Sequence, residues 1–285
     1  MAQICPCCGS QEVTHFVKVL EYDYYNCQGC DSLFIDTAYL VKIDNGLNIV
    51  KYQEDYWKME LEDAKKRAYG VALARMAEAI YYCKRPVNKF LDIGTGPGYF
   101  LDIVKKQLPA NANHFYGIEL FPPEEEFRTK SKNYITGDLA NLTDKFDCGI
   151  CIEVVEHLTP TMLDNMLQKL ASVSNPEALY IINTGMPEYV KHEDMAYLDP
   201  TKRGHLVSYS LKAASIIAGR HGFIAHRIPG KTWAFALELT DKNYEGSDIR
   251  DRIWHALPQN VDLLVDDEMG STLKILGLET VRAYN

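Results

Sequence analysis

The chain has 285 residues, of which 47% are hydrophobic, and its 39 acidic and 30 basic side chains give a formal net charge of -9. This length and apolar content can bury a sizeable core and predict one main domain with additions rather than two equal domains. The acidic balance disfavours extended nucleic acid as a partner, because a polyphosphate backbone is repelled, although it leaves room for a local basic patch.

Membrane insertion and secretion are also disfavoured. No uninterrupted apolar run approaches the roughly 20 residues that a membrane span needs. Met1 to Ser10 lacks the apolar core of a signal peptide. We therefore expect a cytoplasmic enzyme without membrane contact.

Cysteines cluster at the start of the chain. Two Cys-x2-Cys pairs are separated by 18 residues, and their members are Cys5, Cys8, Cys27 and Cys30. This spacing is typical of four thiolates that hold one Zn²⁺ tetrahedrally. The stretches between the pairs read as hairpin strands, so residues 1–40 are expected to form a zinc ribbon. A closed Cys₄ site leaves no open position for substrate, which favours a structural role.

Other candidate ligands are left out of this zinc site. Cys7 stands between two ligands and is read as a free or outer-shell thiol, and His15 is also excluded, because structural zinc is four-coordinate. Cys148 and Cys151 lie three apart on an expected strand and face opposite ways. They are expected to be small buried side chains.

Residues 41–85 are mostly helical in pattern, and they are expected to link the ribbon to the next domain and to cover its pocket. Tyr52, Tyr56 and Trp57 can form a flap over that pocket, although an aromatic helix face is more often packing. Apolar residues recur at intervals of three and four, as expected for one buried stripe. The members of this stripe are Ala68, Val71, Ala72, Met76, Ala79 and Ile80.

The stretch Lys89 to Leu101 runs from an apolar strand through a glycine turn into a helix. Glycines at 94, 96 and 98 permit the close approach of a ligand. A dinucleotide fingerprint would place its third glycine at position 99, where the chain has Tyr99. The turn therefore predicts a different nucleotide-like pocket beyond the strand end.

Strands and helices alternate after this turn. Strands are expected at 114–120, 133–137, 146–152 and 178–184, with helices after Pro122-Pro123 and at 160–174 and 210–223. Strands at 224–228 and 232–239 flank Pro229-Gly230 as a hairpin. The alternation predicts an α/β fold with a parallel sheet covered on both sides. The loop 185–208 is expected beside the pocket as a lid, and the extension 241–285 is expected to pack or oligomerise.

Four motifs occur in order: Asp92 before G-x-G-x-G, Glu119 21 residues after Gly98, Gly137-Asp138-Leu139, and F-D-C-G-I-C-I-E-V-V-E-H-L from Phe146. The pattern resembles the class I S-adenosylmethionine-dependent methyltransferases. With the ribbon, it is similar to a bacterial group associated with polysaccharide or secondary-metabolite pathways. The resemblance implies a Rossmann-like domain at 86–240, mostly parallel with its last strand antiparallel, and Glu119 as acceptor for both ribose hydroxyls. The cofactor residues it implies are Asp92, Gly94, Gly96, Gly98, Glu119, Leu120, Asp138, Leu139 and Glu153.

Transfer to a hydroxyl requires the loss of its proton, and candidate bases are His157, Glu153 and His205. The arrangement E-x-x-E-H with a later histidine is similar to metal-dependent small-RNA 2′-O-methyltransferases and to ubiquinone-pathway O-methyltransferases. That likeness implies a second divalent-metal site at Glu153, Glu156, His157 and His205, for Mg²⁺, Mn²⁺, Fe²⁺ or Zn²⁺. The same motif also occurs without metal, where the carboxylates line the cofactor pocket.

Three functions follow from these features. The first is O-methylation of a small molecule or sugar-containing acceptor. The second is RNA methylation, with the ribbon holding RNA. The third is a non-catalytic cofactor-binding scaffold, which the intact glycine and acidic motifs disfavour.

Overall fold

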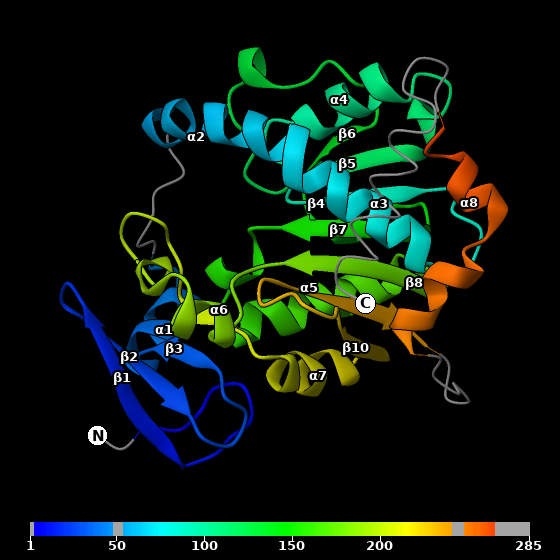
Figure 1. The fold of residues 1–285 in the computed structure, drawn as a ribbon. Coiled ribbons are helices and arrows are strands. Elements are labelled where there is room, and N and C mark those ends of the chain that lie inside the picture. Colours follow the sequence, from blue (N-terminus) through cyan, green and yellow to red (C-terminus); the bar gives the residue numbers. More distant parts are fainter. Residues whose placement is uncertain (1–2, 48–53, 241–247, 266–285) are drawn as a thin grey trace.

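A seven-stranded sheet forms the centre of the molecule (Figure 1). The structure is a computed structural model that describes residues 3–47, 54–240 and 248–265. The strand order is β10-β11-β8-β7-β4-β5-β6; β4 to β8 run parallel, and β11 is antiparallel to both of its neighbours. The expected Rossmann-like sheet with a reversed last strand is thus confirmed. Its strands are β4 (Phe90–Ile93), β5 (Phe115–Glu119), β6 (Tyr134–Thr136), β7 (Phe146–Ile152), β8 (Ser174–Asn183), β10 (Phe223–Arg227) and β11 (Ala234–Leu239).

Two apolar cores lie on opposite faces of this sheet. One contains α3 (Leu73–Tyr82) and α4 (Tyr99–Gln107), and the other contains α5 (Pro160–Ser172) and α7 (Leu211–Gly219). All four residues of β4 are buried, as expected for a strand covered on both faces. Cys148 and Cys151 are fully buried on β7, which confirms their reading as core side chains.

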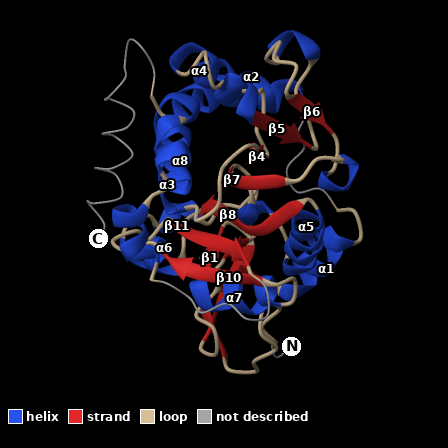
Figure 2. Cartoon of the chain, turned by 90° about the vertical axis from the view of Figure 1, so that its right-hand side faces the viewer, coloured by secondary structure: helices blue, strands red, loops and turns tan. Residues whose placement is uncertain are grey.

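The helical segment directly before β4 forms one long run that lies across one face of the sheet (Figures 1 and 2). It consists of α2 (Glu54–Arg67), a π-helical turn η1 (Ala68–Ala72) and α3. The expected stripe is buried except at Val71, which is 38% exposed. The π turn adds a residue to the helical repeat and so turns Val71 outward. Tyr52 and the side chains of Tyr56 and Trp57 lie outside the described residues.

A second, four-stranded sheet lies at the N-terminus. It contains β1 (Val13–Val19), β2 (Tyr22–Cys27), β3 (Leu33–Ile35) and β9 (Val207–Ser208), and the helix α1 (Thr37–Asp44) follows β3. The hairpin of β1 and β2 was expected from the sequence. The fourth strand was not, because β9 comes from the loop expected as a lid.

Two connections differ from expectation. The loop 185–208 contains α6 (Pro187–His192) and the 3₁₀ turn η6 (Met195–Tyr197), with Pro187 at the first helical position. Only the 3₁₀ turn η3 (Glu125–Phe127) follows Pro122-Pro123. That segment is held close to the glycine turn, because Thr129 N–H donates to Pro97 O over 2.8 Å.

The described part of the C-terminal extension packs against α3. It contains η7 (Ile249–His255) and α8 (Pro258–Asp262), and the Asn260 amide donates to the carbonyls of Cys83 and Arg85 over 3.2 and 2.9 Å. Residues 241–247 and 266–285 lie outside the description. In the described ranges, no helix has the length and apolar character to cross a bilayer. The remaining short turns are η2 (Ala112–His114), η4 (Leu139–Asn141) and η5 (Val155–His157).

Candidate active site

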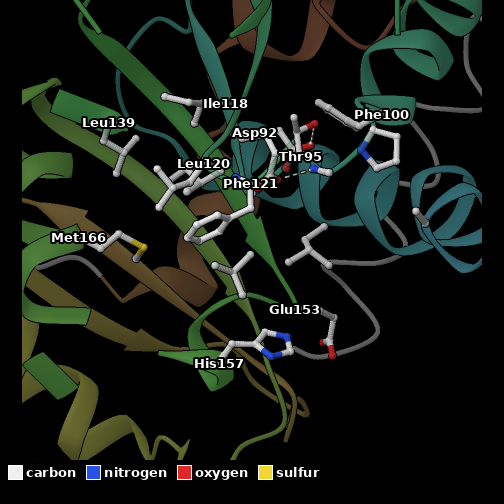
Figure 3. A pocket seen from close by; sticks show the side chains of 18 of the residues that line it. Asp92, Thr95, Phe100, Ile118, Leu120, Phe121, Leu139, Glu153, His157 and Met166 are labelled. Carbon is white, nitrogen blue, oxygen red and sulfur yellow. Dashed lines mark hydrogen bonds between the residues drawn. The ribbon is translucent and has the colours of Figure 1, made fainter. Parts of the chain in front are cut away.

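A cavity of about 810 Å³ opens beyond the carboxyl ends of β4, β5 and β7 (Figure 3). Strand order reverses between β4 and β7, and ligands of open α/β sheets bind at such a switch point. Asp92 and Thr95 lie at one end, and Glu153 and His157 at the other. Eight of the nine residues expected to bind cofactor line this cavity: Asp92, Gly94, Gly96, Glu119, Leu120, Asp138, Leu139 and Glu153.

The ninth, Gly98, is absent from the described lining and serves the turn itself. Its φ of +79° is left-handed, and it forms the N-cap of α4. A Cβ at Gly98 would lie 2.4 Å from Thr129 Cγ2. Gly94 is equally constrained, since its Cβ would lie 2.5 Å from Val154 Cγ2. Glycine is therefore required at both positions for backbone conformation and close packing.

Glu119 is tied to the backbone on either side of the cavity. Its Oε2 accepts from Gly96 N–H over 2.8 Å and its Oε1 from Phe121 N–H over 2.9 Å. Each carboxylate oxygen keeps a further lone pair for a ligand donor. Burial raises the pKa of Glu119, against the effect of these hydrogen bonds.

The other two carboxylates of the motifs, Asp92 and Asp138, differ in the direction of their pKa shifts. Asp92 accepts from Thr95 Oγ1 over 2.6 Å, and burial raises its pKa to about 7, with the charge of Glu119 adding to the effect. Asp138 caps η4 through Ala140 N–H and lies 2.6 Å from Lys169 Nζ. Burial raises the pKa of Asp138, but these two contacts outweigh it and the net shift is downward.

A group of three side chains lies at the His157 end. Glu156, His157 and His205 each offer a ligand atom, and these atoms lie within 4.8 Å of one another. We call these residues the trio. His157 lines the cavity, whereas His205 is only 5% exposed and lies behind it. Glu153, expected as a fourth member, lines the cavity outside this group and accepts from the Asn183 amide over 3.1 Å.

Both histidines of the trio are held in one tautomer. His157 Nδ1 lies 3.1 Å from Gly204 O, and His205 Nδ1 lies 2.7 Å from Tyr197 O. A carbonyl oxygen only accepts, so each Nδ1 carries the hydrogen and each Nε2 keeps its lone pair. Burial lowers the pKa of both imidazoles, that of His205 to about 3.

Glu156 supplies the remaining acceptor atoms. Its side chain is fully buried; Oε1 accepts from Tyr197 OH over 2.9 Å, and Oε2 has no hydrogen-bond partner among the described residues. His205 Nε2 lies 3.9 Å from Oε1. Two imidazole nitrogens with free lone pairs and a carboxylate therefore lie within 4.8 Å of one another. Such ligands suit a divalent cation, and each histidine already makes its second hydrogen bond.

The four expected zinc ligands also converge. All four sulfurs lie within 4.8 Å of one another, with Cys5 and Cys30 3.6 Å apart and Cys8 and Cys27 3.5 Å apart. Zn–S bonds of about 2.3 Å place neighbouring sulfurs of a tetrahedron about 3.8 Å apart, so the group fits Zn²⁺. Cys7 is buried outside this group, and His15 lies 3.0 Å from Asp23.

Two partners in this site were missed from the sequence. Tyr197 bonds to Glu156 and carries the carbonyl that orients His205, and Lys169 neutralises Asp138. Neither residue lies in a motif. Only the length of the loop 185–208 pointed towards Tyr197.

The sheet, its switch-point cavity and its glycine turn define a Rossmann-like nucleotide-binding domain. Residues 61–225, more than half of the chain, match the family described as methyltransferase domain, and the chain belongs to that family. It is thus a methyltransferase.

Solved structures with a similar fold include an amino pentose methyltransferase from Micromonospora echinaspora. It shows 13% identity and a TM-score of 0.44, over 67% of this chain and 98% of that one. Magnesium protoporphyrin IX methyltransferase from Synechocystis shows 19% identity and a TM-score of 0.42, over 65% of this chain and 96% of that one. No curated protein matches the sequence.

Proposed function

We propose that the chain transfers a methyl group from S-adenosylmethionine to a hydroxyl of a small-molecule acceptor, which includes sugars. The observation that carries this proposal is the cavity at the switch point, with the glycine turn and Glu119 at one end and His157, a member of the trio, at the other. S-adenosylmethionine supplies a methyl group on a sulfonium cation. Its positive charge suits a cavity lined by Asp92, Glu119 and Glu153.

Residues of the glycine turn and β5 would hold this cofactor. Gly94 and Gly96 let a ligand approach the backbone closely, and the free lone pairs of Glu119 can accept from two hydroxyls. Much of the rate then comes from alignment of acceptor and methyl group, because displacement at carbon needs an in-line geometry.

Calorimetry with S-adenosylmethionine tests the cofactor site. Glu119→Ala is expected to weaken binding by about 1 to 3 kcal/mol, as for the loss of hydrogen bonds to a charged group. Glu188→Ala is the matched control, since Glu188 pairs with Arg227 outside the cavity lining. Unchanged affinity in Glu119→Ala would refute this assignment.

For the acceptor we propose a divalent-cation site formed by the trio. The unpartnered Oε2 of Glu156 and the two Nε2 lone pairs support it. A cation there would lower the pKa of an acceptor hydroxyl and orient it. Glu153, on the cavity wall beside the trio, would then take the hydroxyl proton.

Turnover in metal-depleted buffer separates this proposal from base catalysis. The chelator must be mild enough to leave the ribbon zinc in place, and each cation is added back in turn. We expect activity to return with one cation, and Glu156→Gln to need at least about ten times more of it. Full turnover without added metal would exclude the cation and leave His157 as the base.

A further inference from the structure

The segment Gly204 to Leu206 contains one member of the trio and is hydrogen-bonded to the other two. Gly204 O orients the His157 ring, and His205 supplies the second imidazole. Leu206 N–H donates to Glu156 O over 2.7 Å. Any displacement of these three residues therefore changes the relative positions of all three ligand atoms.

The same segment is held by the N-terminal ribbon. Tyr24 OH donates to His205 O over 2.5 Å, and Ile35 N–H donates to Leu206 O over 3.0 Å. Phe34 then pairs with Val207 in the antiparallel ladder of β3 and β9. Tyr24 and Ile35 are both fully buried. The ribbon and the trio are thus joined by a continuous set of hydrogen bonds to the backbone of residues 204–206.

This set of bonds extends to the cysteines. Ser210 Oγ donates to the carbonyl of Cys30, and Ser210 N–H donates to Ser32 Oγ over 3.0 Å. Cys27 N–H donates to Ser32 O over 3.0 Å. Cys30 is therefore linked to Ser210 by one hydrogen bond, and Cys27 is linked to Ser210 by two hydrogen bonds through Ser32. Ser210 follows β9 in the chain.

We infer that the zinc ribbon positions the active site, with Tyr24 as a positioning residue for both histidines of the trio. The inference rests on the proposed role of the trio in the reaction. The ribbon would supply the outer hydrogen-bond support that fixes imidazole orientation at the proposed cation site. Its zinc would act on the trio through the backbone of residues 204–210.

The test is Tyr24→Phe, which removes one hydroxyl and keeps the ring. Histidine-selective ¹⁵N NMR of the zinc-loaded protein reports the tautomer and the hydrogen bonds of each imidazole, which change when a ring is displaced. We expect the signals of His157 and His205 to shift and that of His226, which pairs with Glu238 on the other sheet edge, to stay. Tyr25→Phe is the matched control, because its ring packs on His15 and Phe34 within the ribbon.

Mn²⁺ titration followed by electron paramagnetic resonance supplies the second readout, since Mn²⁺ prefers the trio's ligands to thiolates. Tyr24→Phe should weaken Mn²⁺ binding about tenfold, while S-adenosylmethionine affinity stays within about twofold. Unshifted His157 and His205 signals would overturn the inference, whether or not Mn²⁺ binds. Shifted signals in a protein that binds no Mn²⁺ would support positioning and refute only the cation site.

Discussion

Asp92 is a buried carboxyl in the described cavity, and burial raises its pKa from 3.8 to about 7. The folded state therefore holds a proton on Asp92 that the unfolded chain has released. The stability associated with this proton is complete below about pH 4 and falls as pH rises through about 7. A positively charged ligand in the cavity would lower the free-energy cost of ionising Asp92.

Asp92→Asn should therefore stabilise the protein without ligand at neutral pH. Asparagine can still accept from Thr95 Oγ1 and does not titrate. The gain in the free energy of unfolding should grow between pH 4 and pH 7 to a few kcal/mol, because a tenfold change in proton affinity is worth about 1.4 kcal/mol. Urea unfolding at pH 5 and pH 7.5 measures it. A gain that does not change with pH would contradict the assignment, and S-adenosylmethionine affinity should fall in the same variant.

Gly98 sets a steric limit at the same turn. Gly98→Ala should lower the free energy of unfolding by about 1 to 3 kcal/mol, since the new Cβ meets Thr129 and the backbone is left-handed. Gly219→Ala is the control, because nothing lies within 4 Å of its Cβ in α7. That variant should be neutral or more stable. Equal unfolding midpoints for the two variants would refute the steric account.

Elements with a strong local signal were the ones predictable from the sequence. The buried strands β4 and β7 have continuous apolar runs, and the hairpin of β10 and β11 surrounds a Pro-Gly turn. Strand β9 has two residues and is a strand only through its pairing with β3, so no local sequence pattern predicts it. Ala68, Val71 and Ala72 keep the three- and four-residue apolar spacing of an α-helix in the sequence, so the π turn over Ala68–Ala72 was not predictable either.

The site shows the same division. Glu119 and the glycines stand in a motif with defined spacing, whereas the contacts of Tyr197 and Tyr24 join residues brought together by tertiary folding. Tyr24 and His205 are 181 positions apart in the sequence. Periodicity and spacing describe neighbours along the chain and carry no information on such a pair. The convergence of Glu156, His157 and His205 was suggested by a motif, but the place of Glu153 outside the group required the structure.

The ribbon is the element for which we expect a structural metal. Strand β1 is mostly exposed or half-buried, so we expect Zn²⁺ binding to contribute to the free energy that folds the ribbon. We expect one zinc per chain by elemental analysis, and Cys8→Ser should lose it. A strong chelator should then expose residues 3–36 to limited proteolysis. A ribbon that resists proteolysis in chelator would count against a structural zinc.

At the scale of the molecule, the net charge favours a small-molecule acceptor over RNA. The chain has a formal charge of -9, and Lys169 and Arg67, the lysine and arginine side chains in the described cavity lining, are already paired with carboxylates. Few cations remain there to displace counterions from a phosphate backbone. Binding of RNA should accordingly be weaker than the 10⁻⁴ to 10⁻⁶ M typical of nonspecific sites at physiological salt.

Filter binding with labelled RNA across a salt series tests this expectation in the full, zinc-loaded chain. The retained fraction should be low at physiological salt, and the affinity should depend only weakly on salt concentration, because few phosphates are neutralised. Cys8→Ser, which lacks the ribbon zinc, should behave like the wild type. Micromolar binding with a steep salt dependence, lost in Cys8→Ser, would instead make the ribbon an RNA-binding module. In that case RNA would replace the small molecule as the acceptor.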